Sequence, residues 1–432
     1  FLAIFVTLPL LYVLFSAVTA DIAIWRRLWT TRIPELLVNT SSLAIGVAII
    51  DLVLGVSLAW IITRYRFPGS AVWDWLIVLP LAIPSYVLAY TYTYLLQRHG
   101  PLEQVWQTIA GPGAQIFSPF SFAGVVLVMS LNTFPFVYLL ARSALKNFNV
   151  SFEEAARATG ASRLSTFFRV SLPMIRPSLI AGLFLAILYV VSDFGAVSML
   201  RFQTFTYAIY QQMTGRFDNT AATCLSLLLV GSTFLFLLGE RWFRQRSRFY
   251  QTTGRFRKPV PQLCSSLQTV CFSGYLGFIV VAAFGFPVLL LVQWTLAALS
   301  AGDISSMFFG YLWNSLSLAA VTATLAIFVG IPLAFLACRK QTWTSLLCIQ
   351  GAYTGYVLPG PVAALAVLVL VSQLIPELYG TAVVLLIAYL VHFLPVALQG
   401  MESTIHQLTP NLEEAARKLG SGSFRTFRTI TF

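Results

Sequence analysis

The sequence predicts an all-α polytopic membrane protein built from two parallel repeats. Of its 432 residues, 58% are apolar and only 10% are charged, and the mean hydropathy is +0.81. A soluble domain carries about 25% charged residues, so this chain cannot hide its apolar side chains in a core surrounded by water. Long continuous apolar runs match the hydrocarbon thickness of a bilayer, and several segments of the first half recur in the second.

Ten apolar runs are candidate membrane spans, six in the first half and four in the second. They are continuous rather than alternating, which favours helices over barrel strands. The longer runs must tilt or protrude from the bilayer. The runs cover residues 1–19, 37–63, 71–97, 119–141, 179–199, 223–240, 268–298, 312–338, 343–373 and 378–400.

Lysine and arginine set the predicted orientation, because cytoplasmic loops are enriched in them. If the polar stretch 151–177 is cytoplasmic, 21 of the 27 basic residues lie on that side. The net charge of +12 therefore follows membrane topology and does not indicate nucleic acid. The basic, aromatic segment 241–258 is expected to bind lipid headgroups. The outer exceptions are Arg26, Arg27, Arg32, Arg98, Arg201 and Arg216.

The two halves align at constant offsets. Residues 39–84 match the second half at an offset of 275, and residues 132–160 match it at an offset of 260. Because an even number of spans separates the copies, the repeats are expected to be parallel, with an axis along the membrane normal. We expect a first repeat at 1–240, a basic cytoplasmic linker at 241–267 and a second repeat at 268–432.

The change of offset places 15 extra residues in the outer loop 98–118. In this loop Leu102, Val105, Trp106 and Ile109 recur at helical spacing. A short helix on the outer membrane surface fits this pattern, and a plain connecting loop fits it equally well.

A polar stretch, Ser151 to Pro177, interrupts the first half and recurs from Asn411 to Phe432. Its acidic start favours a helix N-terminus, and Gly160 ends that helix. Ser162 is placed to cap a second short helix, and Pro173 and Pro177 are expected to redirect the chain into the next span. The result is an elbow of helix, glycine and helix, suited to docking into a groove on a soluble partner.

The elbow resembles the EAA loop of permeases in binding-protein-dependent ABC importers. That pattern reads Glu-Ala-Ala, three residues, Gly, nine residues, an aliphatic residue, one residue and Leu-Pro. The second copy departs from it at Phe432, where Leu is usual, and we expect the chain to be part of a longer protein. The matching residues are Glu154, Ala155, Ala156, Gly160, Val170, Leu172 and Pro173.

The resemblance implies a type I permease fold with six spans per half, of which about ten of twelve are present here. It implies two ABC ATPase subunits on the cytoplasmic side, an extracytoplasmic solute-binding protein, surrounding lipid and the bacterial inner membrane. The implied ATPase-coupling residues are Glu153, Glu154, Ala155, Ala156, Gly160, Glu413, Glu414, Ala415, Ala416 and Gly420.

We expect no enzyme activity, no catalytic residue and no cofactor in this chain. None of its lysines follows a glycine, so the sequence lacks a G-K-[ST] loop that would cradle phosphates. ATP and Mg would therefore belong to the partner ATPases. Five cysteines without CxxC spacing are expected to be small apolar residues rather than a metal site.

Polar side chains within spans are candidates for the translocation pathway, because burying them in a bilayer is costly. Asp51, Asp193 and His392 qualify, and Asn132 aligns with His392 at the offset of 260. Hydrogen bonding between helices is the alternative role for these side chains.

The segment from Val190 to Met199, followed by Thr204 to Tyr210, resembles the fifth-span signature ADFGT…TFTTAIY of fused ferric-iron permeases. Ser192 and Ala196 depart from that signature. A carboxylate such as Asp193 suits a hard cation such as Fe(III). The implied function is alternating-access import of ferric iron. A thiamine, polyamine or phosphonate importer, or a secondary transporter driven by an ion gradient, remains the alternative.

Overall fold

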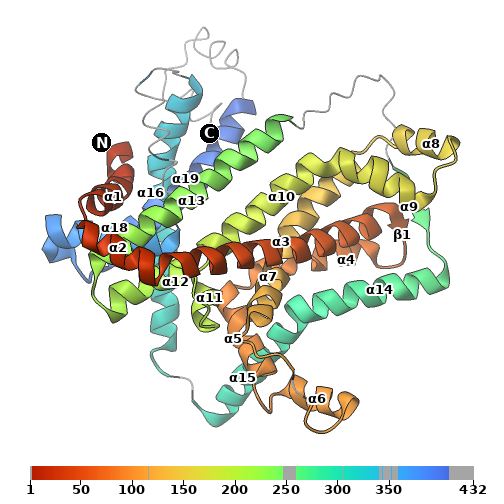
Figure 1. Cartoon of the computed structure of the whole chain (residues 1–432), viewed down its shortest axis with the longest axis horizontal. Coiled ribbons are helices and arrows are strands. Elements are labelled where there is room, and N and C mark those ends of the chain that lie inside the picture. Colours follow the sequence, from red (N-terminus) through yellow and green to blue (C-terminus); the bar gives the residue numbers. More distant parts are fainter. Residues whose placement is uncertain are drawn as a thin grey trace. The chain divides into compact units, whose positions relative to one another are not determined.

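The computed structural model describes residues 2–114, 116–246, 259–303, 305–339 and 359–407, with positions 343 and 352. In these residues, helices make up almost all of the regular structure (Figure 1). Seven of the described helices are long and apolar enough to cross a membrane, or nine if each bent pair counts as one span. A shorter apolar helix, Gly360–Leu374, overlaps the ninth predicted run. The predicted all-α polytopic fold is confirmed.

The chain divides into two compact units. The larger unit comprises Arg26–Gln211 and Gly231–Asp303. The smaller unit comprises Phe1–Trp25, Gln212–Val230 and Ile304–Phe432. Each unit has its own buried apolar cluster.

The centre of the larger unit is α7 (Phe122–Lys146), which packs between α3 (Ile33–Arg64) and α10 (Leu172–Ser192). Two glycines allow the close approach, as is common between membrane helices. A Cβ on Gly55 would lie 2.7 Å from the Cβ of Val137, and one on Gly182 would lie 2.9 Å from the Cα of Val137. Both neighbours of α7 therefore meet it at the same residue.

The predicted span 71–97 is not one straight helix, which corrects the sequence-based expectation. Its two halves are bent by 94° between Ala82 and Ser85. The cause is Pro84, which has no N–H and keeps the preceding Ile83 extended. The elements here are α4 (Ser70–Leu76), the 3₁₀ turn η1 (Leu79–Ala82), α5 (Ser85–Leu96) and α6 (Pro101–Ala110).

The predicted run 179–199 is also interrupted, because α10 ends at Ser192. The outer loop 98–118, by contrast, contains the helix α6, so the helical alternative for this loop is confirmed. The elements that follow α10 are α11 (Gly195–Met199), α12 (Phe205–Tyr210), the π-helical turn η3 (Gln211–Gly215) and α13 (Asn219–Arg246).

The first span of the second repeat packs within the larger unit. The rings of Tyr90 and Tyr94 in α5 lie 5.3 Å from that of Trp294. Strand β1 (Tyr65–Arg66) pairs in parallel with β2, which precedes this span. The elements are β2 (Gln262–Leu263), α14 (Ser266–Val280), the π-helical turn η4 (Val281–Gly285) and α15 (Phe286–Ala301).

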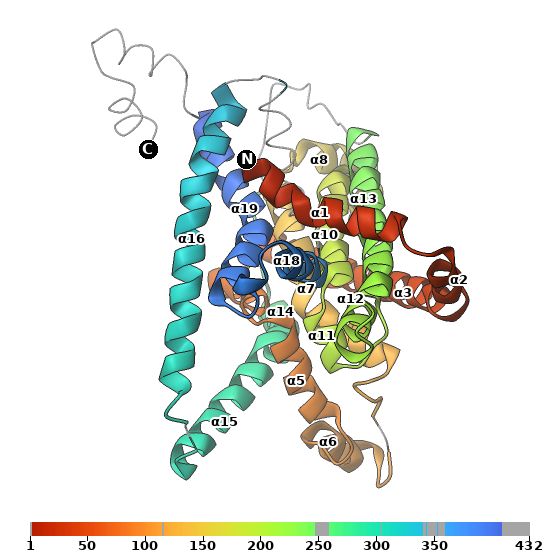
Figure 2. The ribbon, with the colours of Figure 1, turned by 90° about the vertical axis from the view of Figure 1, so that its left-hand side faces the viewer.

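In the smaller unit α16 and α19 lie side by side (Figure 2). The first span of the chain packs here, because Leu8 of α1 lines the same small cavity as Val367 of α18. The helix α2 (Ile22–Thr31) follows α1 after a 91° bend. The remaining elements are α1 (Leu2–Val18), α16 (Phe308–Arg339), α18 (Gly360–Leu374), the 3₁₀ turn η5 (Pro376–Leu378) and α19 (Ala382–Gln407).

The sequence repeat recurs in the element bounds. Both ends of α3 and α16 match at the offset of 275, and α7 and α19 begin at positions that match at 260. Pro84 and Pro359 precede α5 and α18 with nearly equal backbone angles, φ −57° and ψ 140° against φ −55° and ψ 145°. The division at residues 240 and 267 stays a prediction, since each unit combines helices from both repeats.

Candidate functional site

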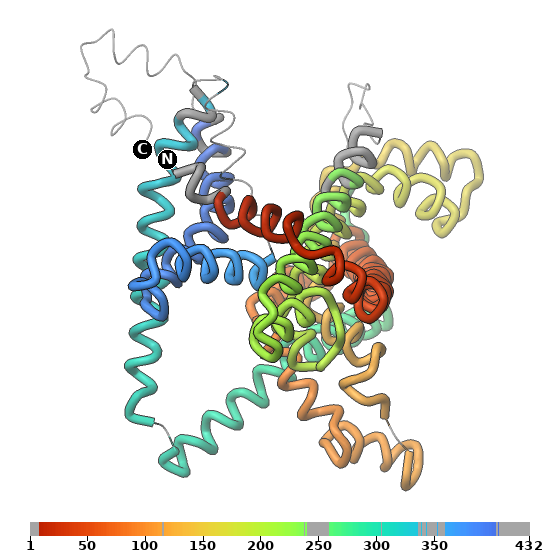
Figure 3. Tube along the Cα trace, turned by 60° about the vertical axis from the view of Figure 1, so that its left-hand side comes forward, coloured from red at the N-terminus to blue at the C-terminus, as the bar shows by residue number. Residues whose placement is uncertain are grey.

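The elbow, residues 151–171, turns back on itself at one end of the larger unit (yellow in Figure 3). The helix α8 (Ser151–Ala158) ends at Gly160, whose φ is +89°, a conformation that glycine adopts without a steric penalty. The Ala161 N–H donates to the Ala156 carbonyl (3.1 Å) and closes the helix end. Ser162 then accepts the Ser165 N–H (3.2 Å), so its predicted capping role is confirmed.

The expected redirection at Pro173 and Pro177 is wrong. The helix α9 (Arg163–Thr166), the π-helical turn η2 (Phe167–Ser171) and α10 form one helical segment from Arg163 to Ser192. Pro173 lies inside this segment, two residues after the end of η2. The wider turn η2 precedes it, and such turns accommodate local disruption within a helix. The second arm of the elbow is therefore continuous with the following span.

The two adjacent glutamates of the elbow have different environments. Glu153 is buried and accepts hydrogen bonds from Arg64 Nη2 and Ser171 Oγ, both at 2.6 Å. Glu154, by contrast, is exposed, as are Ala155 and Gly160. Glu154 is therefore at the surface of the elbow, while Glu153 is turned toward α3.

The predicted second elbow lies outside the described residues. Its residues Glu413, Glu414, Ala415, Ala416 and Gly420 match the first copy in sequence. Their role in ATPase coupling stays a prediction.

Asp193 follows α10 and connects two breaks in the helices. Its Oδ2 accepts a hydrogen bond from Ser85, the first residue of α5, and its Oδ1 accepts the Ala196 N–H of α11 (2.8 Å). Its carbonyl accepts the Thr206 hydroxyl (2.7 Å). The backbone approaches α5 closely at Gly195, where a Cβ would lie 3.0 Å from the Cβ of Tyr86. The half-buried carboxylate is thus held at a junction of broken helices.

Asn132 hydrogen-bonds to the backbone at one of these breaks, the bend before α5. It is buried in α7, and its amide donates to the carbonyls of Ile83 (3.0 Å) and Pro80 (3.3 Å). These carbonyls lie next to the bend before α5, where regular helical bonding is interrupted. This is the hydrogen-bonding alternative weighed for Asn132. A path-lining role stays a prediction.

Asp51 is fully buried between α3 and α7. Its Oδ2 lies 2.7 Å from the Thr133 hydroxyl. Its Oδ1 has no hydrogen-bond partner among the described residues. The second repeat has Ala326 and Phe393 at the two equivalent positions, so this polar contact belongs to the first repeat alone.

His392 is half-buried on α19 of the smaller unit, with its ring 5.0 Å from that of Phe393. Within the described part of the chain its Nδ1 has no hydrogen-bond partner. No group of three or more His, Cys, Asp or Glu in the described ranges is arranged to hold a metal ion. His392 stays a pathway candidate.

A charged cluster in the larger unit was missed by the sequence interpretation. Asp74 of α4 accepts hydrogen bonds from Tyr138, Arg142 and Lys146 of α7. The sequence signal for this cluster is the spacing of Tyr138, Arg142 and Lys146, which recur every four residues and so share one face of a helix. Because Asp74 is 64 residues from Tyr138 in the chain, the spacing alone did not identify the acidic partner. The cluster ties α4 to the end of α7 that leads into the elbow.

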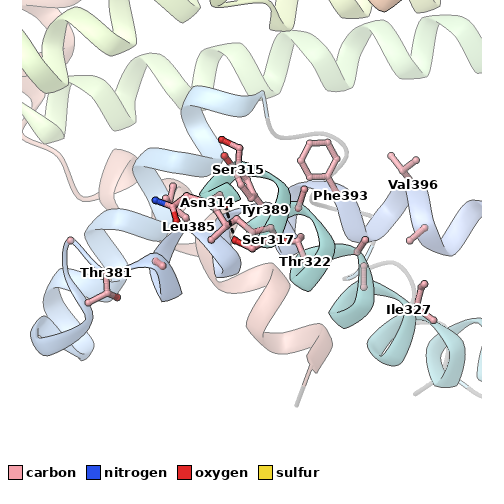
Figure 4. Close-up of a pocket in the computed structure, with 17 residues that line it drawn as sticks. Asn314, Ser315, Ser317, Thr322, Ile327, Thr381, Leu385, Tyr389, Phe393 and Val396 are labelled. Atoms are coloured by element: carbon pink, nitrogen blue, oxygen red, sulfur yellow. Dashed lines mark hydrogen bonds between the residues drawn. The ribbon is translucent and has the colours of Figure 1, made fainter. Parts of the chain in front are cut away.

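A groove of about 1110 Å³ lies between α16 and α19 in the smaller unit (Figure 4). Asn314 and Ser315 line it, and their counterparts Asn39 and Thr40 hydrogen-bond to Gln203 and Phe205 in the first repeat. Ala397 also lines the groove, and its counterpart is Val137, against which α10 packs. The groove thus corresponds to a face that protein covers in the first repeat, so we do not assign a solute to it.

Comparison with known proteins identifies a family of transport permeases. Residues 51–249 match the family described as the binding-protein-dependent transport system inner membrane component. The chain is 31% identical to the Fe(3+)-transport system permease protein FbpB 2 of Haemophilus influenzae, over 98% of this chain and 81% of that protein. It is 25% identical to the putative ferric transport system permease protein FbpB 1 of the same organism, over 93% of this chain and 66% of that protein.

A shorter relative matches about half of the chain. The molybdenum transport system permease protein ModB of Escherichia coli is 31% identical over 49% of this chain and 91% of its own length. A protein of nearly one repeat's length is thus similar to part of this two-repeat chain.

Proposed function

Because the chain belongs to the family of inner membrane components of binding-protein-dependent transport systems, we propose that it is the permease of an ATP-driven importer. It is a multi-pass protein of the inner membrane. In the proposed cycle, an extracytoplasmic binding protein delivers the solute, and ATPase subunits drive the permease between outward-open and inward-open states.

The observation that carries this proposal is the elbow. Glu154 and Ala155 are exposed on a short helix whose end is closed at Gly160. Behind them, Glu153 fastens the same helix to α3. A short helix that is anchored on one side and exposed on the other is suited to a groove on a soluble subunit. We propose that this groove belongs to the ATPase.

The repeat of the elbow supports two ATPase contacts per chain. The sequence from Glu413 to Gly420 matches the first elbow, so one chain would bind two copies of the ATPase. ATP and Mg would bind to those subunits. On ATP binding the two ATPases would close, bring both elbows together and open the transport cavity outward.

For the solute we propose ferric iron. Asp193 supports this choice, because a carboxylate oxygen is a hard ligand that suits Fe(III). The names of the two Haemophilus influenzae relatives support it as well.

The test is reconstitution of the full chain in proteoliposomes with an ABC ATPase and a solute-binding protein from the same organism. We expect ATP-dependent uptake of radioactive Fe(III) presented on the binding protein. Uptake of thiamine, a polyamine or a phosphonate in place of Fe(III) would correct the solute and leave the importer intact. Uptake driven by an ion gradient without the ATPase would overturn the importer itself.

A further inference from the structure

The side chain of Glu153 points into the protein and not toward the face that a partner would meet. Its Oε1 accepts hydrogen bonds from Arg64 Nη2 at the end of α3 and from Ser171 Oγ at the start of the next span. The side chains of Arg64 and Glu153 are only 11% and 5% exposed. We call these three residues the Arg64–Glu153–Ser171 clamp.

Aromatic rings hold the arginine of the clamp in place. The guanidinium of Arg64 lies over the ring of Trp60 (4.8 Å) and near that of Phe148 (5.3 Å), within the range of cation–π attraction. Trp60 also packs edge-on against Phe167 in the second arm of the elbow (4.7 Å). Both arms of the elbow therefore contact the same turn of α3.

A buried ion pair is a poor device for stability alone. The free energy needed to remove both charges from water is nearly as large as the free energy gained from their attraction. Replacing such a pair by apolar residues often leaves stability unchanged. Removing one partner is far more damaging, because the other charge is left buried. A pair of this kind is better explained by the fixed geometry it imposes on the elbow relative to α3.

The clamp recurs in the sequence of the second repeat. Arg64 matches Arg339 at the offset of 275, and Glu153 and Ser171 match Glu413 and Thr431 at 260. Two other acidic side chains of the larger unit do not recur. The positions equivalent to Asp51 and Asp74 are Ala326 and Ile349. The clamp residues thus recur in sequence, with Thr431 in place of Ser171, whereas Asp51 and Asp74 have apolar counterparts.

The clamp also connects to the second repeat within the larger unit. Arg64 is followed directly by β1, which pairs with β2, and the Cys264 N–H donates to the Arg66 carbonyl (3.2 Å). The ring of Phe272 in α14 lies 4.9 Å from that of Tyr65. A displacement of the elbow would therefore reach α3 and α14 together. Figure 1 shows α8, α9, β1 and the start of α14 at the same end of this unit.

We propose that the Arg64–Glu153–Ser171 clamp positions the elbow and transmits its movement to α3. This inference rests on the proposed function, because the movement is that of an ATPase bound to the elbow. Glu154 would make the contact with the ATPase, and Glu153 would convert that contact into movement of the spans. Without the clamp the ATPase would still bind and hydrolyse ATP, but the spans would not follow.

The test compares Glu153→Gln with Glu154→Gln in the reconstituted complex. Gln keeps the shape of Glu153 and removes its charge, so the chain is expected to fold. For Glu153→Gln we expect normal co-purification of the ATPase and about a fivefold or larger fall in solute moved per ATP hydrolysed, the lower end of usual coupling strengths. For Glu154→Gln we expect weaker co-purification. Glu103→Gln removes another buried glutamate, in α6, and should change neither measurement.

A second measurement does not depend on the solute. Spin labels at Ala158 and Arg66, both exposed, in a background without native cysteines, report the distance from the elbow to the end of α3. In the otherwise unchanged complex this distance should be the same with and without ATP. In Glu153→Gln it should shift when ATP is added.

The outcomes separate the two proposals. A wild-type chain that fails to bind the ATPase overturns the proposed function and the transmission with it. Normal ATPase binding with an unchanged transport-to-hydrolysis ratio in Glu153→Gln overturns the clamp alone. Loss of ATPase binding in Glu153→Gln would also overturn it, by making Glu153 part of the docking contact.

Discussion

The hydroxyl of Ser85 donates a hydrogen bond to the carboxylate of Asp193, although 108 residues separate them in the chain. Ser85 begins α5 just after the bend in the third span, and Asp193 stands just after the end of α10. One carboxylate therefore joins two breaks in membrane-spanning helices. Such breaks expose backbone groups and hinge points, and in transporters they are often found where solute passes.

We predict that Asp193→Asn lowers uptake about tenfold and leaves co-purification of the ATPase unchanged. The amide loses the charge that strengthens the hydrogen bonds from Ser85 and Ala196, and hydrogen bonds to charged groups contribute about 1.5–3 kcal/mol. The measurement is the initial rate of Fe(III) uptake against solute concentration. Unchanged uptake kinetics would remove Asp193 from the pathway.

Two further variants identify how Asp193 acts. Ser85→Ala removes the hydrogen bond between the two breaks and keeps the carboxylate. If Asp193 holds the solute directly, uptake should fall less in Ser85→Ala than in Asp193→Asn. An equal loss would show that the contact itself matters. Asp21→Asn is the matched control, since Asp21 also accepts a backbone N–H at a helix start, that of Ala23 (2.9 Å). It should not change uptake.

Local patterns in the sequence predicted the elements that depend on neighbouring residues. Gly160 as the end of α8 and Ser162 as the cap of α9 follow from residue type alone, because each acts within a few positions of itself. The predicted runs 37–63 and 312–338 match at the offset of 275, and the bounds of α3 and α16 match at the same offset. These features required no knowledge of tertiary contacts.

Contacts between distant residues were beyond the sequence interpretation. The bend before α5 occurs at Pro84 inside a long apolar run whose composition favours a continuous helix. Asn132, 49 residues away in the chain, donates a hydrogen bond to the carbonyl of Ile83. The pairing of Arg64 with Glu153 spans 89 residues. Glu153 and Glu154 are adjacent and identical in type, so only the packed structure separates the buried from the exposed one.

We predict that Gly160→Trp abolishes co-purification of the ATPase. An L-residue in the left-handed conformation of Gly160 costs about 1–2 kcal/mol, and the indole would occupy the exposed face of the elbow. Gly111→Trp is the control. Gly111 also has a positive φ, +102°, and a Cβ at either glycine would have no neighbour within 4 Å. Equal effects of the two substitutions would mean that strain, and not the elbow surface, causes the loss.

We predict that Gly182→Leu destabilises the larger unit. The new side chain would meet the backbone of α7 at Val137, and forcing extra atoms into a packed contact costs about 1–3 kcal/mol. The measurement is the midpoint of thermal unfolding of the detergent-purified chain, followed by tryptophan fluorescence. Gly231→Leu is the control, because a Cβ at Gly231 in α13 has no neighbour within 4 Å. Equal midpoints for both variants would contradict the close approach of α10 and α7.

Asp51 and Thr133 provide a test of whether a buried polar contact serves function or folding. The corresponding helices α16 and α19 pack side by side with Ala326 and Phe393 at these positions, so the helix pair does not need the contact to form. A carboxylate buried in a membrane is costly and is usually retained for function. The contact should therefore be dispensable for stability and needed for transport.

We predict that the double variant Asp51→Ala, Thr133→Val unfolds at the wild-type temperature or above it, while uptake falls. Replacing both partners removes the buried charge together with its donor. The single variant Thr133→Val should be less stable by about 1–3 kcal/mol, because it leaves the Asp51 carboxylate without the hydroxyl that lies 2.7 Å away. Thermal unfolding and uptake are measured on the same preparations. If the double variant unfolds as early as the single one, the contact is structural, and if its uptake is normal, Asp51 lies outside the pathway.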